Sequence, residues 1–355
     1  MVKLSVVVAI YNVEKYVKKC IESLLDETND EYELILVDDG SKDNSAAICD
    51  SYSNHKNIKV IHQENSGVSV ARNTGIENST GKWITFVDGD DFVDKGFIKE
   101  IINSIDNIDT DMIVFNYNAF YDSNRVFKCR MIPFDGNQYV SDKKDLFQKR
   151  MISQYYKGGD KSTVVSSGTT WCKVIKKDIL ETNNVRFKPG LIKAQDTVFW
   201  LNATEFADKI YYLDKCLYNY RLSSGSISSG KRYIKNSVDE FDNLIFEYSK
   251  FIEKYDKDQS YIEAFNLRCI QVLMWNIDHN FFNKKNDKKL TDKTNELKDL
   301  IERKNYSRAI DNVDKENLPT RLKVLLRYMR NKKLKRYFVV YNNYNFLSNI
   351  KNGRK

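Results

Sequence analysis

The residues best suited to chemistry are the three aspartates of Asp88-Gly89-Asp90-Asp91, which directly follow the apolar run Trp83–Val87. Carboxylates this close repel one another, and a divalent cation that bridges them to a diphosphate relieves the repulsion. Oxygen ligands suit Mg²⁺ or Mn²⁺. The alternative is a solvated acidic turn in which Asp91 or Asp94 caps the next helix. The residue types alone leave both interpretations open.

A second acidic pair, Asp38-Asp39, follows the apolar run Tyr32–Val37 and precedes Gly40-Ser41. A carboxylate at this place is able to accept a hydrogen bond from the imide N–H of uracil or from a ribose hydroxyl. A type I turn with an aspartate cap on the next helix explains the same residues.

The segment Asn65-Ser66-Gly67 opens a predicted helix that contains Ser69 and Arg72. Free N–H groups at a helix N-terminus, with these two side chains, suit phosphate or ribose oxygens. An N-capped amphipathic helix with an exposed Arg72 is the structural alternative, and the two interpretations are compatible.

The order of the elements explains how these segments come together. Strand and helix patterns alternate through roughly the first 120 residues. Strands are predicted at 4–10, 32–37, 58–62, 83–87 and 112–121, and helices at 13–25, 44–52, 68–78 and 95–105. This order predicts an α/β fold with a mostly parallel sheet and helices on both faces. Ligands of such sheets bind at the carboxyl ends of the strands, where Tyr11-Asn12, Asp38-Asp39 and the 88–91 segment all fall.

The second half of the chain changes character. Helices are predicted at 143–153 and 196–207, with short strands at 210–213 and 217–222. Long helical patterns then follow at 233–255, 261–282, 292–304 and 319–330. A Ser/Gly-rich stretch near 223–232 predicts the boundary between a catalytic domain, 1–225, and a helical region, 226–355.

The composition excludes several classes of protein. With 41% hydrophobic and 30% charged residues the chain is globular rather than disordered. Six scattered cysteines without a C-x-x-C pattern fit a reducing cytosol. The apolar N-terminus is too short to span a membrane and lacks a signal-peptide cleavage region. The three histidines form no triad or metal pattern, and no Walker or G-x-G-x-x-G loop is present.

The C-terminal tail is basic, with eleven Lys/Arg and no Asp/Glu from Arg321 to Lys355. The tail also carries an apolar helical stripe that begins Leu322, Leu325, Leu326 and Met329. Such a helix packs on the body of the protein or on another subunit, or lies in the plane of an anionic membrane surface. Nucleic-acid binding is disfavoured because no nucleic-acid module accompanies the charge.

Several motifs together resemble the family 2 glycosyltransferases, which are inverting enzymes of the GT-A fold. The resemblance covers roughly residues 1–230. The motifs are Ser5–Val13, Leu36–Asp43, Asn65-Ser66-Gly67 with Ala71-Arg72-Asn73, Phe86–Asp91, Lys193–Phe199 and Leu217–Arg221, followed by Ser226-Ile227-Ser228. Gln195 departs from the family pattern, which usually has Glu-Asp where this chain has Gln195-Asp196.

The resemblance implies a role for each motif. Asp196 is implied as the general base, although a helix N-cap is its structural alternative. Asp90 with Asp88 is implied to hold Mn²⁺ or Mg²⁺ on the donor diphosphate. The donor-binding residues implied are Ala9, Tyr11, Asp39, Asn65, Gly67, Arg72, Asp88 and Arg221.

We therefore expect a metal-dependent inverting glycosyltransferase that uses a UDP-glucose, UDP-galactose or UDP-GlcNAc class donor. The hexose or N-acetylhexosamine would pass to a hydroxyl of a glycan, a lipid-linked or a glycoprotein acceptor. The expected location is the cytoplasm, with peripheral contact at the inner face of the plasma membrane or homo-oligomerisation through the C-terminal helices. The rivals are a nucleotidyltransferase that forms nucleotide-sugars and a catalytically silent scaffold with a basic helical tail.

Overall fold

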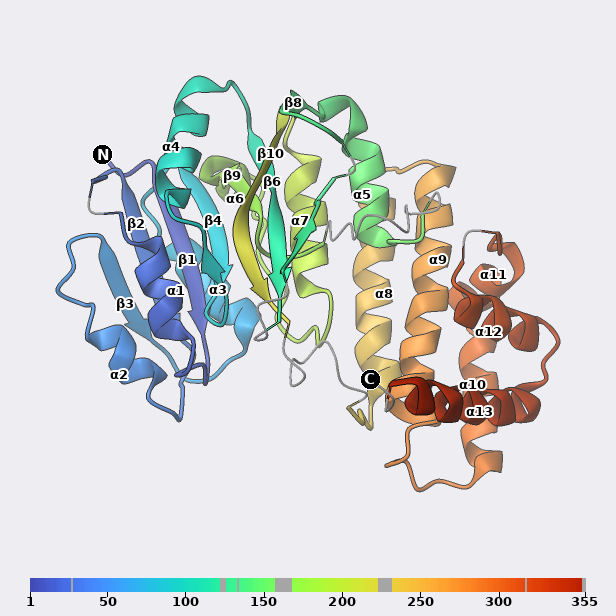
Figure 1. The fold of residues 1–355 in the computed structure, drawn as a ribbon. Helices are drawn as coiled ribbons and strands as arrows, with labels where there is room; N and C mark the ends of the chain where they lie inside the picture. The colour runs from blue at the N-terminus through green and yellow to red at the C-terminus, as the bar shows by residue number, and fades with distance from the viewer. Residues whose placement is uncertain are drawn as a thin grey trace. The chain divides into compact units, whose positions relative to one another are not determined.

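The structure is a computed structural model, and it describes residues 1–352 except 27, 122–125, 133, 157–167, 223–231 and 317. For residues 344–352 it describes the backbone alone. The chain divides into two compact units. Residues 1–154 and 160–226 form an α/β unit, and residues 155–159 and 227–355 form a helical unit (Figure 1). Most of the Ser/Gly-rich stretch predicted as a boundary lies outside the described residues.

The α/β unit is built on one sheet with the strand order β3-β2-β1-β4-β9-β6-β10-β5, in which β7 pairs with β6 and β8 with β10. The strands are β1 (Leu4–Ile10), β2 (Tyr32–Asp38), β3 (Ile58–His62), β4 (Trp83–Asp88), β5 (Phe92–Val93), β6 (Met112–Phe120), β7 (Val126–Cys129), β8 (Gln138–Tyr139), β9 (Lys173–Lys176) and β10 (Ile210–Arg221). The helices are α1 (Val17–Leu24), α2 (Ser45–Asp50), α3 (Val68–Glu77), α4 (Phe97–Asn107), η1 (Ser141–Lys143), α5 (Lys144–Ile152), α6 (Lys177–Thr182) and α7 (Gln195–Glu205).

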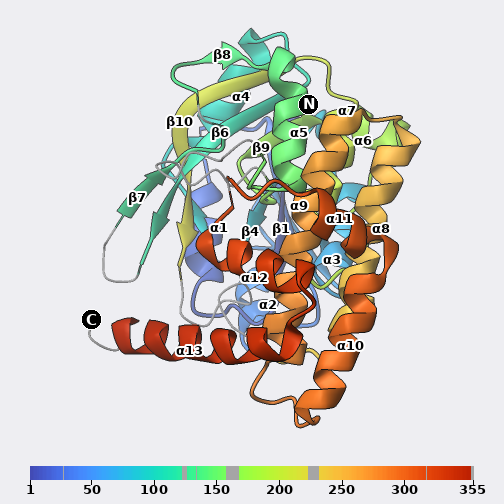
Figure 2. The ribbon, with the colours of Figure 1, turned by 90° about the vertical axis from the view of Figure 1, so that its right-hand side faces the viewer.

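Strand β1 forms the centre of the site-bearing half of the sheet. It pairs in parallel with β2 on one side and β4 on the other. Its consecutive residues Val6, Val7 and Val8 are all fully buried, because both faces of the strand are covered. Figure 2 shows α1 and α3 on opposite sides of β1 and β4. The predicted α/β fold is thus confirmed.

The sheet is more mixed than the sequence predicted. The β1–β2, β2–β3, β1–β4 and β6–β10 pairs are parallel. Strand β9 lies between β4 and β6 and is antiparallel to both. The two strands predicted at 210–213 and 217–222 are one strand, β10, which continues past register irregularities between Leu213 and Tyr218. Polar residues at these irregularities explain why the apolar pattern broke there.

The helical unit contains α8 (Ser237–Lys254), α9 (Gln259–Asn276), the π-helix η2 (Ile277–Phe281), α10 (Leu290–Glu302), α11 (Lys304–Asn312), α12 (Thr320–Arg330) and α13 (Leu334–Asn352). The predicted helix 261–282 therefore ends as an α-helix at Asn276 and continues as a π-helical turn. Helix α11 was missed because only Tyr306, Ala309 and Ile310 of its nine residues are buried.

The basic tail packs on its own unit. The apolar residues predicted on one face of α12 are all buried, as are Leu334, Tyr337 and Tyr341 of α13. Tyr341 donates a hydrogen bond of 2.8 Å to Asp278 of η2, and Arg321 of α12 pairs with the same carboxylate. The structure thus supports packing on the body for this stripe, and the stripe is not free to enter a membrane. Among the described helices, none is long and apolar enough to cross a membrane.

Candidate active site

The structure brings three polar strand ends to one edge of the sheet, as the sequence predicted. Ala9 lies opposite Val37 on one side and Asp88 on the other, and Ile10 lies opposite Asp38. Because parallel strands end at the same edge, the loops that follow β1, β2 and β4 meet there. The Tyr11 side chain is 44% exposed at this edge, so its ring is available to a ligand.

The carboxylate of Asp39 ties the end of β2 to the loop before α3. It accepts hydrogen bonds from the backbone N–H of Ser66 at 2.9 Å and of Gly67 at 2.8 Å. The side chains of Gln63 and Asn65 donate at 2.7 and 3.3 Å. A carboxylate has about four acceptor positions, and these four donors occupy them. Two of the N–H groups that the sequence assigned to a ligand are therefore held by Asp39.

Gly67 and Gly89 permit these close approaches. Gly67 has φ of 89°, a left-handed conformation that L side chains rarely adopt. Gly89 sits so close to β1 that an added Cβ would lie 3.2 Å from the carbonyl oxygen of Ala9. The backbone of the acidic loop thus packs directly on the strand that ends beside Tyr11.

Arg72 projects from α3 to the end of β4. Its Nη2 donates a hydrogen bond of 2.7 Å to Oδ1 of Asp88. The Arg72 side chain is 6% exposed and that of Asp88 is 29% exposed. Nη1 of Arg72 is buried without a hydrogen-bond partner among the described residues. A buried guanidinium with an unpaired N–H is unusual and marks a place for an anionic or oxygen-rich ligand.

The remaining two aspartates of the acidic loop differ in their surroundings. Asp91 is 2% exposed and accepts hydrogen bonds of 2.7 Å from the Tyr218 hydroxyl and from the backbone N–H of Arg221. Asp90 is half-buried, and its backbone oxygen accepts from Nε of Arg221 at 3.1 Å. Burial raises the pKa of Asp90, and the charge of Asp88 raises it further. Asp91 therefore fixes the loop to β10. At Asp90, burial and repulsion from Asp88 outweigh the opposing charges of Arg221 and Arg72.

Arg221, at the end of β10, reaches across the loop. Its guanidinium lies 4.4 Å from the ring centroid of Tyr16 and 4.8 Å from that of Phe120. Aromatic faces stabilise a cation without neutralising it, so the charge of Arg221 remains effective at the loop. The residues that follow it, 223–231, lie outside the described part of the chain.

Asp196 stands in the first turn of α7, preceded by Ala194 with φ of 59°. The Thr170 hydroxyl donates a hydrogen bond of 3.3 Å to Oδ2 of Asp196. Burial raises the pKa of Asp196, while the Arg72 charge lowers it and the Asp88 charge raises it. These couplings place Asp196 within electrostatic reach of the Arg72–Asp88 pair. A carboxylate with a raised pKa in such a place is suited to accept a proton.

Two neighbours of Asp196 were missed by sequence reasoning. Thr170 is held by the indole of Trp200, which donates to its carbonyl oxygen at 2.9 Å. Lys173 is fully buried, and its ammonium donates to the carbonyl oxygens of Thr169 at 2.7 Å and Trp171 at 3.4 Å. Burial lowers the pKa of Lys173 to about 7. No spacing signal marks these residues, because they come from a strand antiparallel to its neighbours and from the loop before it.

The acidic loop fits a divalent cation through Asp88 and Asp90. Their oxygen donors and the raised pKa of Asp90 suit a cation, whereas both oxygens of Asp91 are already engaged. Within the described residues, no group of three or more His, Cys, Asp or Glu has a metal-binding arrangement. Two carboxylates, completed by substrate phosphate and water, are the set that Mg²⁺ commonly uses.

Comparisons with known proteins agree with this geometry. Residues 5–182 match the model of the family described as Glycosyl transferase family 2. The chain is 31% identical over 260 residues to the putative glycosyltransferase EpsH of Bacillus subtilis, covering 72% of this chain and 71% of EpsH. It is 33% identical over 228 residues to the glycosyltransferase GlyA of Streptococcus pneumoniae, but this match spans only 31% of GlyA and 64% of this chain.

The fold has a solved counterpart. The structure of S. aureus TarS residues 1–349, in complex with UDP-GlcNAc, superposes with a TM-score of 0.68 at 24% identity. That match covers 97% of this chain and 91% of the TarS chain.

Proposed function

This chain belongs to glycosyl transferase family 2, and we propose that it moves a hexose or N-acetylhexosamine from a UDP-sugar to a hydroxyl of a surface glycan, lipid-linked or glycoprotein acceptor. The observation that carries the proposal is the arrangement of Asp88, Asp90 and Asp196 around Arg72. Two carboxylates at a strand end suit a metal–diphosphate, and the third, with a raised pKa, suits proton transfer. Membership of this family disfavours the nucleotidyltransferase and the silent scaffold.

The donor is held at the carboxyl edge of the sheet. The uracil lies against the loop from Ala9 to Tyr11, whose ring offers a stacking surface. Asp39 shapes this side by fixing Asn65 and Gly67, and a direct bond from the uracil imide to Asp39 would replace one of the four bonds it already accepts. The unpaired Nη1 of Arg72 donates to a donor oxygen. The UDP-GlcNAc bound by TarS supports a UDP-sugar.

The leaving group is stabilised by positive charge at the acidic loop. Asp88 and Asp90 would hold Mn²⁺ or Mg²⁺, which would neutralise charge on the diphosphate. Arg221, fixed by Asp90 and by the rings of Tyr16 and Phe120, adds a second positive charge. Charge that develops on the departing UDP thus meets groups already in place.

Asp196 is the general base of the reaction. It takes the proton from the acceptor hydroxyl as that oxygen attacks the anomeric carbon from the face opposite UDP. The C–O bond to UDP breaks in the same displacement, so an α-linked donor gives a β-glycoside. A pKa above the ordinary aspartate value makes the carboxylate a stronger base.

The two units have different proposed roles. We propose that residues 1–225 carry donor binding and catalysis. In the helical region, 226–355, the exposed Lys332, Lys333, Lys335 and Arg336 would contact an anionic membrane surface by charge alone. The expected location is therefore the cytoplasm, at the inner face of the plasma membrane.

The test is a panel of UDP-glucose, UDP-galactose and UDP-GlcNAc, with GDP- and dTDP-sugars for comparison, assayed for binding and hydrolysis with and without Mn²⁺. Binding of one UDP-sugar that chelation abolishes supports the proposal. The variant Asp196→Asn should bind that donor with unchanged affinity while turnover falls at least about a hundredfold, the scale of a lost general base. Donor binding lost together with turnover would instead assign Asp196 a structural role.

A further inference from the structure

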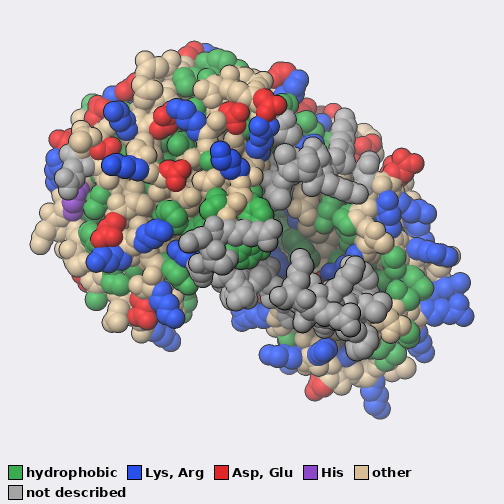
Figure 3. Space-filling model, in the orientation of Figure 1, with side chains coloured by type: hydrophobic (Ala, Val, Ile, Leu, Met, Phe, Trp, Pro, Cys, Tyr) green, Lys and Arg blue, Asp and Glu red, His purple; other side chains and the backbone are tan. Residues whose placement is uncertain are grey.

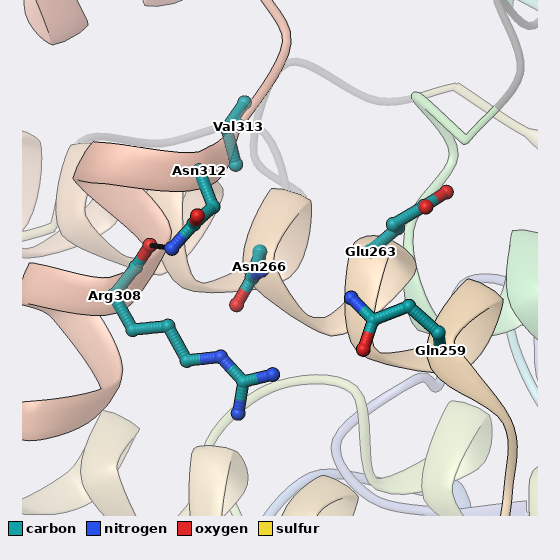
Figure 4. A pocket seen from close by; sticks show the side chains of 6 residues that line it. All are labelled: Gln259, Glu263, Asn266, Arg308, Asn312 and Val313. Atoms are coloured by element: carbon teal, nitrogen blue, oxygen red, sulfur yellow. Dashed lines mark hydrogen bonds between the residues drawn. The ribbon is translucent and has the colours of Figure 1, made fainter.

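The helical unit contains a polar pocket of about 250 Å³ between α9 and α11. Its lining residues are Gln259, Glu263 and Asn266 on α9, and Arg308, Asn312 and Val313 on and just after α11 (Figure 4). The α9 residues are spaced by four and three positions, so they share one face of the helix. Two packed helices normally fill such a face with apolar side chains, and here five of the six are polar.

Asn266 is the buried member of this set. It is 4% exposed, and its Oδ1 has no hydrogen-bond partner within the described part of the chain. Burying such an atom is costly unless a partner arrives. Figure 4 shows the oxygen of Asn266 on the side of the pocket where Arg308 lies.

The charged residues of the pocket restrict which class of ligand can bind there. Glu263 and Arg308 both line it, yet they form no ion pair with each other or with another described residue. A ligand must therefore offer donors to Glu263 and acceptors to Arg308. Hydroxyl groups do both, and the carboxamides of Gln259 and Asn266 match them because each has an adjacent donor and acceptor. Phosphate offers acceptors alone and would face Glu263.

The size of the pocket limits the ligand to one small unit. Its 250 Å³ lies just below the roughly 300 Å³ at which pockets for drug-sized ligands begin. We propose that this pocket binds a single polyhydroxylated unit, a sugar or polyol residue of a glycan chain. Its use in holding the acceptor chain rests on the proposed function, but the binding itself does not.

Saturation-transfer NMR on the full chain tests the proposal. The probes are N-acetylglucosamine, galactose and glycerol, with glycine for comparison. Binding of inorganic phosphate, which has no C–H proton, is followed by its ³¹P linewidth. Saturating UDP and Mg²⁺, a diamagnetic cation that leaves the probe signals sharp, are added so that the donor site is occupied. We expect saturable binding of at least one hydroxylated probe. Asn266→Ala and Arg308→Gln should each weaken it about tenfold, the effect of one lost hydrogen bond.

Lys304→Gln is the matched control, because it removes one positive charge from the same helix at an exposed position outside the pocket. It should bind as the wild type does. Arg308 is itself exposed, so its variant keeps the fold even if Asn266→Ala does not. Hydroxylated probes that do not bind, or that bind all variants alike, would overturn the proposal, as would binding of glycine or phosphate alone.

UDP-sugar hydrolysis is measured on the same protein preparations without added UDP, because UDP would occupy the donor site. Sugar binding that Asn266→Ala weakens, in a protein that consumes no UDP-sugar, would refute the proposed function and leave the pocket assignment intact. Turnover of a UDP-sugar without binding of any hydroxylated probe would refute the pocket assignment and leave the proposed function intact.

Discussion

Arg72 donates a hydrogen bond of 2.7 Å to Asp88 through one Nη and leaves the other Nη buried without a partner among the described residues. The pair joins helix α3 to the end of strand β4. It also acts on a third residue, because the charge of Arg72 lowers the pKa of Asp196 while that of Asp88 raises it. One guanidinium thus links the proposed diphosphate side of the site to the proposed base.

Two substitutions of Arg72 distinguish the effect of its positive charge from that of its second N–H donor group. Arg72→Lys keeps a positive charge near Asp88 but loses the second donor, since an ammonium is a point charge and not a fork. We expect UDP affinity to fall about tenfold in Arg72→Lys and more in Arg72→Met, as measured by calorimetry. Equal affinities in Arg72→Lys and the wild type would show that the unpaired Nη1 contacts no part of the donor.

Lys173 should tune the pH dependence of transfer. Its protonated form stabilises the ionised Asp196 and lowers the pKa of that carboxyl. In Lys173→Met the pKa of Asp196 therefore rises, and the acidic limb of the kcat/KM profile moves to higher pH. Thr170→Val should shift the limb the same way, because it removes the 3.3 Å hydrogen bond to the carboxylate. Thr170→Ser keeps the hydroxyl and should restore the wild-type profile.

The stability of Lys173→Met gives an independent readout. The folded-state pKa of Lys173 is about 7, below its ordinary value of 10.5, so the fold favours the neutral amine. Stability from this group is present above the ordinary pKa and is lost as pH falls through the folded value. The Tm of the variant relative to the wild type should therefore be higher at pH 6 than at pH 10. A difference independent of pH would show that Lys173 is not buried in this way.

Membrane contact, if it occurs, should be electrostatic. The apolar stripe of α12 and α13 is buried in the helical unit, so contact would come from exposed basic residues, of which 332, 333, 335 and 336 lie closest together in the sequence. Changing all four to Gln should reduce flotation with anionic vesicles sharply, because each basic residue contributes about 1 kcal/mol near such a surface. Tm should not change, since none of the four is buried.

A matched control removes the same charge from the α/β unit. Four exposed lysines there, replaced by Gln, are Lys18, Lys82, Lys95 and Lys99. This variant should float as the wild type does. Equal loss in both variants would indicate net charge as the cause, and wild-type protein that does not bind anionic vesicles would refute the membrane contact.

The sequence predicted most reliably where local pattern and burial agree. Strands β1 and β3 begin and end at the predicted residues, because β1 is apolar at every position except Ser5 and β3 lies between clear turns. The antiparallel β9 escaped prediction, since no rule of sequence order inserts a later strand between β4 and β6. The acidic loop was visible as three aspartates, but the engagement of Asp91 with Tyr218 was not, because those residues are 127 positions apart.

The hydrogen bonds of Asp39 could not be predicted from the sequence either. Its position after β2 was evident from the sequence, and the resemblance implied contact with uracil. The structure fills its four acceptor positions with donors from residues 63–67. These hydrogen bonds join residues that are 24 to 28 positions apart, so they depend on how the two loops meet in the folded chain. The helical and strand periodicities of the sequence carry no information about such contacts.

The metal-free protein should gain stability when Asp90 is made neutral. Burial and the charge of Asp88 raise the folded-state pKa of Asp90 above its ordinary value, so the fold favours the protonated acid. Stability from such a group is fully present below the ordinary pKa and is lost as pH rises through the folded value. At pH 7 Asp90→Asn avoids that loss, so its Tm without metal should exceed that of the wild type, while at pH 4 the two should converge.

Adding Mn²⁺ with UDP should then raise the Tm of the wild type and leave that of the variant unchanged, because ligand binding to the folded state adds stability. Asp208→Asn, at an exposed carboxylate of the same unit, should show neither effect. An Asp90→Asn protein with lower Tm at pH 7 would mean that this carboxylate is a structural acceptor, and the metal assignment would then lose its main physical support.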